Sequence, residues 1–148
     1  MPQRFVPALL AAAALAYACG PRSHTAEPTR KTAVAGPPVA ASLNIKVNSE
    51  VSFAFHITNN ATKRLELTFP SGQTHDIVVM DSAGHEVWRW SEGRMFTQAL
   101  QNKVMESHET LTYEATWKAD GREGKYTVVA SLMSQNHPVE ERIDFAIP

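Results

Sequence analysis

The chain has 148 residues, of which 43% are hydrophobic and 20% are charged, and its formal net charge is −1 at pH 7. So small a net charge provides no long-range attraction for a polyanion, which argues against nucleic acid or an anionic membrane surface as an electrostatic partner. Because Cys19 is the single cysteine, the chain cannot form a disulfide within itself.

Residues 1–18 have the layout of an export signal. One arginine precedes an apolar run from Phe5 to Ala18, which is too short for a permanent membrane-spanning helix. The run ends in Ala16-Tyr17-Ala18 directly before Cys19, where bacterial lipoprotein signals carry a small or apolar triplet. We therefore predict a lipoprotein signal peptide over 1–18 and lipid attachment at Cys19. A plain cleaved signal, giving a secreted protein, is the second interpretation, and an uncleaved N-terminal anchor is the third.

Residues 19–42 are predicted to be a lipidated cysteine followed by a disordered tether. From Gly20 to Ser42 the sequence has prolines, many small residues and no aromatic side chain, so it has little to bury in a core. The tether would hold the following domain away from the membrane. The expected location is the bacterial cell envelope, with the domain facing the periplasm or the exterior.

Residues 43–148 are expected to form one domain, because this length suits a single folding unit. Short runs of alternating apolar and polar residues recur along it, with the period of two that half-buried strands have. The apolar positions are Leu43, Ile45, Val47; Val51, Phe53, Phe55, Ile57; Leu65, Leu67, Phe69; Leu111, Tyr113, Ala115, Trp117; Tyr126, Val128, Ala130, Leu132; and Ile143, Phe145, Ile147. Asp76 to Met80 is apolar after its first residue, as in a strand covered on both faces. With no long helical pattern, the domain is predicted to be an antiparallel β-sandwich.

Residues 77–90 are predicted to form a β-hairpin around a turn that ends in Gly84, which can take a left-handed conformation. In the second strand Trp88 and Trp90 would share one face and Arg89 the other. A domain without a disulfide needs large apolar side chains, so burial of both tryptophans is favoured over an exposed ligand platform, or over one buried and one exposed ring.

The partner of Arg89 depends on the register of this hairpin. Asp76 opposes it in one register, and a shift of one residue separates the two. The sequence leaves this choice open.

Tyr126 makes the sandwich more specifically immunoglobulin-like. It follows a glycine turn at a strand start, where a tyrosine corner donates a hydrogen bond to the preceding loop. Val128 stands where an antibody domain has its second cysteine, so apolar packing would replace that disulfide. The fold class expected is thus all-β, an immunoglobulin-like antiparallel sandwich of about seven to nine strands. An ordinary strand tyrosine is the simpler alternative for Tyr126.

The longest loop expected in the domain runs from Glu92 to Glu109, with a short helix possible around Gln98 to Lys103. It contains Arg94, Met95 and Phe96, which are candidate contacts to a partner protein. The alternative is that Phe96 covers the end of the core and the rest of the loop is solvated. Arg122 to Lys125 is a second, weaker candidate loop.

Nothing in the sequence indicates an enzyme, a cofactor or a small-molecule substrate. It has no nucleophile elbow and no phosphate-binding glycine loop, and the pairs His85-Glu86 and His108-Glu109 lack the second histidine of a zinc motif. His75 and His85 could approach each other across the hairpin, but no third ligand is evident. We therefore expect no metal site.

A resemblance to a known family is carried by an ordered series of short motifs over about 51–132. These are Gly72-Gln73, His75-Asp76-Ile77-Val78-Val79, the turn ending in Gly84, Val87-Trp88-Arg89-Trp90-Ser91, Met95-Phe96-Thr97-Gln98-Ala99, Leu111-Thr112-Tyr113 with Trp117, and Gly124-Lys125-Tyr126-Thr127-Val128. The series resembles the BsuPI family, described as intracellular proteinase inhibitors. The family framework would comprise Gly72, Gln73, Asp76, Gly84, Trp88, Trp90, Phe96, Trp117 and Tyr126.

The resemblance implies an immunoglobulin-like sandwich that inhibits serine proteases of the subtilisin type. Two features depart from the family: the export signal argues against an intracellular protease as the target, and His108 replaces a glycine that often precedes the strand at Leu111. The hypothesis is an envelope-anchored inhibitor that blocks a protease cleft with a loop. The alternative is an envelope lipoprotein whose domain is a non-inhibitory interaction or assembly module, because the shared motifs look like framework residues.

Overall fold

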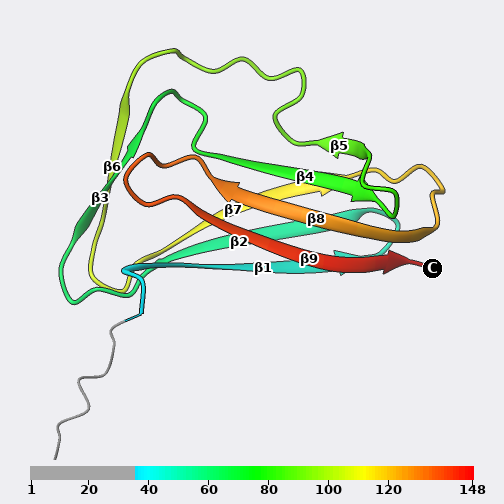
Figure 1. Cartoon of the computed structure of the whole chain (residues 1–148), viewed down its shortest axis with the longest axis horizontal. Helices are drawn as coiled ribbons and strands as arrows, with labels where there is room; N and C mark the ends of the chain where they lie inside the picture. The colour runs from blue at the N-terminus through cyan, green and yellow to red at the C-terminus, as the bar shows by residue number, and fades with distance from the viewer. Residues whose placement is uncertain (1–35) are drawn as a thin grey trace, which may run out of the picture. The chain divides into compact units, whose positions relative to one another are not determined.

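A computed structural model describes residues 36–148, and this part of the chain contains strands and loops but no helix (Figure 1). Its nine strands are β1 Val39–Val47, β2 Val51–Asn59, β3 Leu65–Phe69, β4 His75–Asp81, β5 Glu86–Arg89, β6 Gln101–Met105, β7 Thr110–Trp117, β8 Gly124–Leu132 and β9 Val139–Ile147. Within 36–148 no helix is long and apolar enough to cross a membrane. The predicted signal peptide, Cys19 and most of the tether lie outside the described residues.

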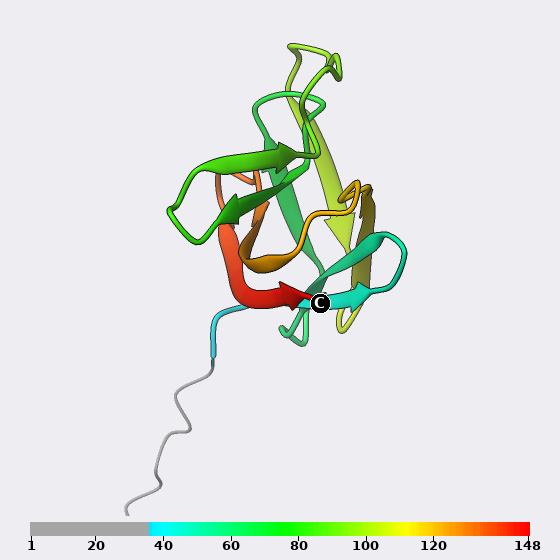
Figure 2. The same ribbon diagram turned by 90° about the vertical axis from the view of Figure 1, so that its right-hand side faces the viewer.

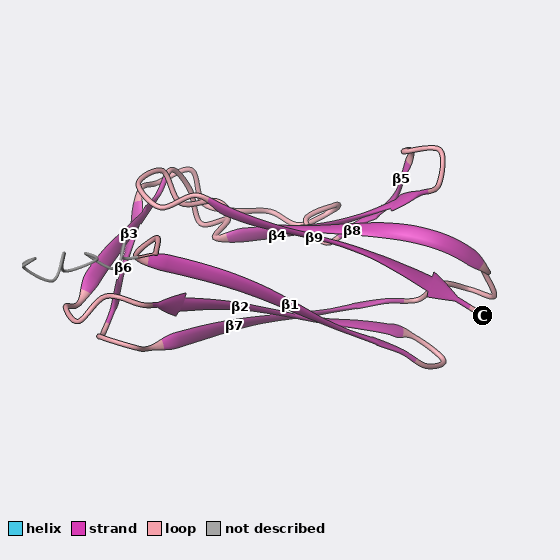
Figure 3. Cartoon of the chain, turned by 60° about the horizontal axis from the view of Figure 1, so that its bottom comes forward, coloured by secondary structure: helices cyan, strands magenta, loops and turns pink. Residues whose placement is uncertain are grey.

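The strands form two facing layers, which confirms the predicted all-β, immunoglobulin-like sandwich (Figure 3). One layer is the antiparallel sheet β1-β2-β7, and the other is the antiparallel sheet β5-β4-β8-β9. Strands β1 and β9 contact each other along one side of the sandwich. A two-stranded ribbon, β3-β6, stands across one end of the two layers (Figure 3).

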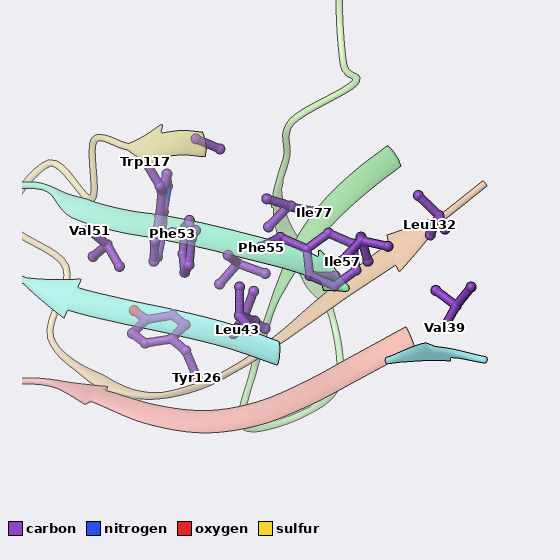
Figure 4. Close-up of a cluster of buried hydrophobic side chains, with 14 of the residues drawn as sticks. Val39, Leu43, Val51, Phe53, Phe55, Ile57, Ile77, Trp117, Tyr126 and Leu132 are labelled. Atoms are coloured by element: carbon purple, nitrogen blue, oxygen red, sulfur yellow. The ribbon is translucent and has the colours of Figure 1, made fainter. Parts of the chain in front are cut away.

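The alternating side chains of the central strands build the core between the layers (Figure 4). In β2 the positions that alternate toward the facing sheet are buried, and β8 has the same pattern from Tyr126 to Leu132. Val128, at the place of an antibody cysteine, is fully buried. Strand β4 differs from the expectation of two covered faces, because Val78 and Met80 are only half-buried.

Two boundaries differ from the sequence predictions. Strand β1 begins at Val39, which is buried and pairs with Asn59, so the last residues assigned to the tether belong to the folded domain. The short helix considered around Gln98 to Lys103 does not form, because Gln101–Met105 is strand β6. This segment pairs along its whole length with β3, and non-local ladder bonds of this kind override a weak local helical preference.

Two local predictions are confirmed, and the departure at His108 is resolved. Gly84 has a φ of +83°, in the left-handed region that the turn requires. The hydroxyl of Tyr126 donates to the carbonyl oxygen of Glu123 at 3.2 Å, as a tyrosine corner does. His108, at the expected glycine position, has a φ of +62°, so the turn keeps a left-handed conformation without a glycine.

Candidate functional site

The loop that joins β5 to β6, residues 90–100, carries the three predicted partner contacts and is referred to below as the β5–β6 loop. It runs along the top of the domain in Figures 1 and 2, in yellow-green. Its base rests on the sandwich through Trp90, and its tip faces solvent. The contacts that fix each part of it determine what it can present to a partner.

Trp90 is held in a stack of rings that joins the two layers. The imidazole of His75, on β4, lies between the indole of Trp90 at 4.0 Å and the ring of Tyr113, on β7, at 4.1 Å. Phe96 packs on Trp90 with a centroid distance of 5.8 Å. The stack therefore anchors both the start and the middle of the β5–β6 loop on the sandwich.

Trp88 and Trp90 both pack against the core and both remain half-buried. Trp88 stacks on Phe53 of the opposite sheet at 5.9 Å, so the two indoles face the same side of their strand, as predicted. Their burial is less complete than expected, because β5 is the edge strand of its sheet and has a neighbour on one side only.

Asp76 holds the start of the β5–β6 loop through hydrogen bonds to Ser91. Its side chain is 8% exposed and accepts hydrogen bonds from the backbone N–H of Ser91 at 3.2 Å and from the Ser91 hydroxyl at 2.9 Å. It also forms an ion pair with the guanidinium of Arg89. A buried carboxylate with this many donors is expensive to disturb, so Ser91 is held firmly at the loop base.

The ion pair also resolves the register of the hairpin. Arg89 lies opposite Val78, which places it diagonally across from Asp76 on the same face. The pairing shifts at Val79 and Met80, where β4 and β5 form an irregularity that displaces the rest of the hairpin. Arg89 also donates two hydrogen bonds to the Glu86 carboxylate, at 3.0 and 2.7 Å. These bonds, with those to Asp76, raise the pKa of Arg89.

Arg94 folds back onto the base of the loop. Its guanidinium lies over the ring of Trp90, 4.4 Å from the centroid, and its Nε donates to the carbonyl oxygen of Trp90 at 2.8 Å. The backbone reaches this position through two successive turns, with Arg94 N–H donating to the carbonyl of Ser91 at 3.1 Å and Gly93 at a φ of +72°. The cation of Arg94 is therefore engaged within the chain.

A second attachment follows Phe96. The N–H of Gly72 donates to the carbonyl oxygen of Thr97 at 2.8 Å. A Cβ at Gly72 would lie 2.6 Å from the Thr97 hydroxyl oxygen and 3.3 Å from the Thr97 nitrogen, so this close approach requires glycine. The neighbouring Gln73 supports the same turn, with its N–H donating to the Ser71 hydroxyl at 3.2 Å.

Arg94, Met95 and Phe96, the three predicted partner contacts, differ in how they pack on the domain. Arg94 and Phe96 are engaged with Trp90, whereas the side chain of Met95 is 99% exposed. Farther along, Leu100 is 70% exposed and Val104 on β6 is also exposed. Arg94, Met95 and Phe96 are adjacent in the sequence, but only Met95 lacks packing against Trp90 in the structure.

His75 is a site residue whose stacking role the sequence did not indicate. It is 6% exposed, its Nδ1 is 3.1 Å from the Thr74 hydroxyl, and its Nε2 is buried without a hydrogen-bond partner among residues 36–148. The pKa of His75 is lowered to about 4, chiefly by burial; the nearby Asp76 opposes this shift and Arg94 adds to it. The imidazole is therefore a neutral stacking element at neutral pH.

The histidine pair considered from the sequence does not form. His75 begins β4, whereas His85 follows the turn at the opposite end of that strand, where its carbonyl accepts from the N–H of Asp81. Among residues 36–148 no group of three histidine, cysteine, aspartate or glutamate side chains is placed to hold a metal ion.

The remaining framework residues lie elsewhere in the core. Trp117 and Tyr126 meet edge to face at 5.3 Å, and both are buried. They contribute to the packing between the two sheets. The second candidate loop, Arg122 to Lys125, is exposed and leads directly into the tyrosine corner.

A family model described as "Intracellular proteinase inhibitor", BsuPI, matches residues 39–137, which is more than half of the chain. The chain belongs to the BsuPI family. The match begins at the first residue of β1 and ends just before β9, so the BsuPI region includes the β5–β6 loop and all of its anchors. Family membership implies a proteinase as the partner in general.

Comparisons with curated proteins and with solved structures give no further match of high identity. A search of curated proteins finds no match. Among solved structures, the beta-glucuronidase of Bacteroides uniformis matches at 12% identity with a TM-score of 0.41, covering 74% of this chain and 13% of that chain. Beta-glucosidase 3B from Thermotoga neapolitana, in complex with alpha-D-glucose, matches at 10% identity with a TM-score of 0.41, covering 74% and 16%. The chain thus spans a small part of the length of either enzyme.

Proposed function

We propose that the protein inhibits a serine proteinase of the subtilisin type by placing the β5–β6 loop in the cleft of the enzyme. The observation that carries this proposal is the combination of an exposed apolar tip with attachments on both sides of it. Met95 faces solvent, while Arg94 and Phe96 are held on Trp90.

The loop is attached to the domain on both sides of Met95. This attachment matters because ordering a flexible loop on binding lowers the affinity of an inhibitor. Each immobilised flexible side chain costs about 0.5–1.5 kcal/mol on association, and a loop held in place before binding avoids part of this cost. The chain has no disulfide to provide that rigidity. The Asp76–Ser91 hydrogen bonds, the Trp90 stack and the Gly72–Thr97 hydrogen bond take its place.

We further propose that the inhibitor is displayed at the cell envelope through a lipid on Cys19. The support is the apolar export signal that ends directly before this cysteine. The target would then be an exported proteinase and not a cytoplasmic one. Palmitate incorporation by the wild-type chain, and its loss in Cys19→Ala, is the expected result; labelling that persists in Cys19→Ala would contradict lipid attachment at this residue.

The inhibitory function is tested with the full-length chain, purified in mild detergent and titrated against subtilisin and against exported proteinases of the same cell. We expect dose-dependent inhibition at micromolar concentration or below, with the inhibitor recovered intact. A folded, uncleaved chain that inhibits none of these enzymes would contradict the proposal.

That negative result would favour the alternative, a non-inhibitory interaction module. One observation supports this alternative independently of the loop. Strand β6 pairs only with β3 among the described strands, and it carries the exposed Val104, so its free edge is available for pairing with a strand of another protein.

A further inference from the structure

Arg94, Met95 and Phe96 of the β5–β6 loop differ in how freely their side chains can contact an enzyme. Arg94 is stacked on Trp90 and hydrogen-bonded to its carbonyl, and Phe96 is half-buried against the same indole. Met95, between them, is 99% exposed. A side chain that packs on nothing can enter a pocket on another protein without breaking any contact of its own fold.

The backbone at Met95 is also free. Within the segment 94–97, backbone hydrogen bonds to described residues use the N–H of Arg94, the carbonyl of Phe96 and the carbonyl of Thr97, and none uses the N–H or carbonyl of Met95. None of the residues 95–97 has a positive φ or belongs to a turn. The segment can therefore pair its backbone with an enzyme as an added strand.

The contacts of Arg94 with Trp90 indicate which kind of enzyme pocket the loop can fill. An acidic primary pocket, such as that of trypsin, needs a free cation. Arg94 would have to leave the face of Trp90 and give up the bond from its Nε to supply one. Met95 is long, flexible and uncharged, and it is suited to a deep apolar pocket.

We propose that Met95 is the side chain that enters the primary specificity pocket of the target, and that this pocket is apolar and not acidic. This inference rests on the proposed inhibitory function and names the specificity-determining residue within it. Trp90 with its stack is then the support, and Arg94 and Phe96 are positioning residues on either side of Met95.

The test compares inhibition constants of full-length variants against three enzymes: subtilisin and chymotrypsin, which have apolar pockets, and trypsin. The wild-type chain is expected to inhibit an apolar-pocket enzyme at least about tenfold more strongly than trypsin. Met95→Gly is expected to weaken that inhibition by about 100-fold, and Met95→Leu to change it by less than about threefold. Met95→Lys is expected to lose affinity for the apolar pocket and to gain it for trypsin.

Leu100→Gly is the matched control, because Leu100 is exposed on the same loop beyond the Thr97 attachment. It is expected to inhibit like the wild type, and thermal unfolding checks that every variant is folded. If the wild type inhibits but Met95→Gly inhibits equally well, the assignment of Met95 is overturned and the inhibitory function stands. If the wild type inhibits none of the three enzymes and no exported proteinase, the inhibitory function itself fails.

Discussion

His75 makes the stability of this domain dependent on pH in a direction that the structure specifies. Its imidazole is buried between Trp90 and Tyr113, its Nε2 has no hydrogen-bond partner in the part of the chain that the structure describes, and its pKa is lowered from 6.5 to about 4. An unfolded chain takes up a proton on this histidine near pH 6.5, whereas the folded chain takes it up only near pH 4. Between these values the unfolded state binds more protons, so the folded state loses stability as the pH falls.

The magnitude follows from the size of the shift. One pKa unit corresponds to about 1.4 kcal/mol, so the loss attributable to His75 between pH 7 and pH 4 is about 3 kcal/mol. A domain of this size has a total stability of about 5–15 kcal/mol, so the effect is large enough to measure by denaturant unfolding. Below about pH 4 the folded state also binds the proton, and this contribution stops growing.

The perturbation is His75→Phe, which keeps an aromatic ring between Trp90 and Tyr113 and removes the titrating group. Urea unfolding of both proteins, followed by tryptophan fluorescence at pH 7, 5.5 and 4, measures the difference between their pH dependences. The pKa values of Asp81 and Glu86 are lowered by hydrogen bonds from the backbone of His85 and from Arg89 respectively. Their contribution is lost as the pH falls through the acid range, but it is common to both proteins and cancels in the difference.

The wild type is expected to lose about 3 kcal/mol more than His75→Phe between pH 7 and pH 4. His108→Asn is the control, because the His108 side chain is exposed and asparagine tolerates its φ of +62°, and it should retain the pH dependence of the wild type. If the wild type and His75→Phe lose the same stability, to within about 0.5 kcal/mol, the reasoning from burial is refuted.

Three further substitutions test the contacts that support the fold and the loop. Gly72→Ala should destabilise the domain by about 1–3 kcal/mol in urea unfolding, because its Cβ would meet the hydroxyl of Thr97, and Thr97→Ala should restore part of the loss; equal losses in both backgrounds would contradict this. His108→Gly should raise the free energy of unfolding by about 0.5–1 kcal/mol, because glycine adopts the φ of +62° without strain, and a decrease would contradict the argument. Tyr126→Phe should cost about 1–2 kcal/mol through loss of the bond to Glu123, whereas an unchanged urea midpoint would show that the corner contributes no stability.

The strands that sequence reasoning identified are those whose side chains alternate. In β2, Val51 to Ile57 alternates because one face meets the core and the other meets solvent, and this pattern is visible without any tertiary information. Strand β6 was missed because only Met105 of its five residues is buried, so its side chains carry no alternating signal. It is a strand because its backbone pairs with β3, and that pairing is non-local.

The candidate site was predictable only in part, because some of its contacts join residues that are far apart in the sequence. The adjacency of Arg94, Met95 and Phe96 is local, so the loop could be found from the sequence. The burial of His75 depends on Tyr113 reaching across from the other sheet, and no local spacing relates these two positions. The partner of Arg89 likewise depended on a shift in pairing at Met80, which the sequence did not indicate.

Trp90 contacts both the core and the β5–β6 loop, so a substitution at Trp90 is a poor test of inhibition. Its indole contacts His75 of the core stack, Phe96 of the loop and the guanidinium of Arg94. A substitution at Trp90 would therefore lower stability and displace the loop together, and a loss of inhibition would not distinguish the two effects. Met95 takes no part in the core, so a change in inhibition at this position reports binding separately from folding. The framework motifs identify the family, whereas the residue that tests its function is the one the framework leaves free.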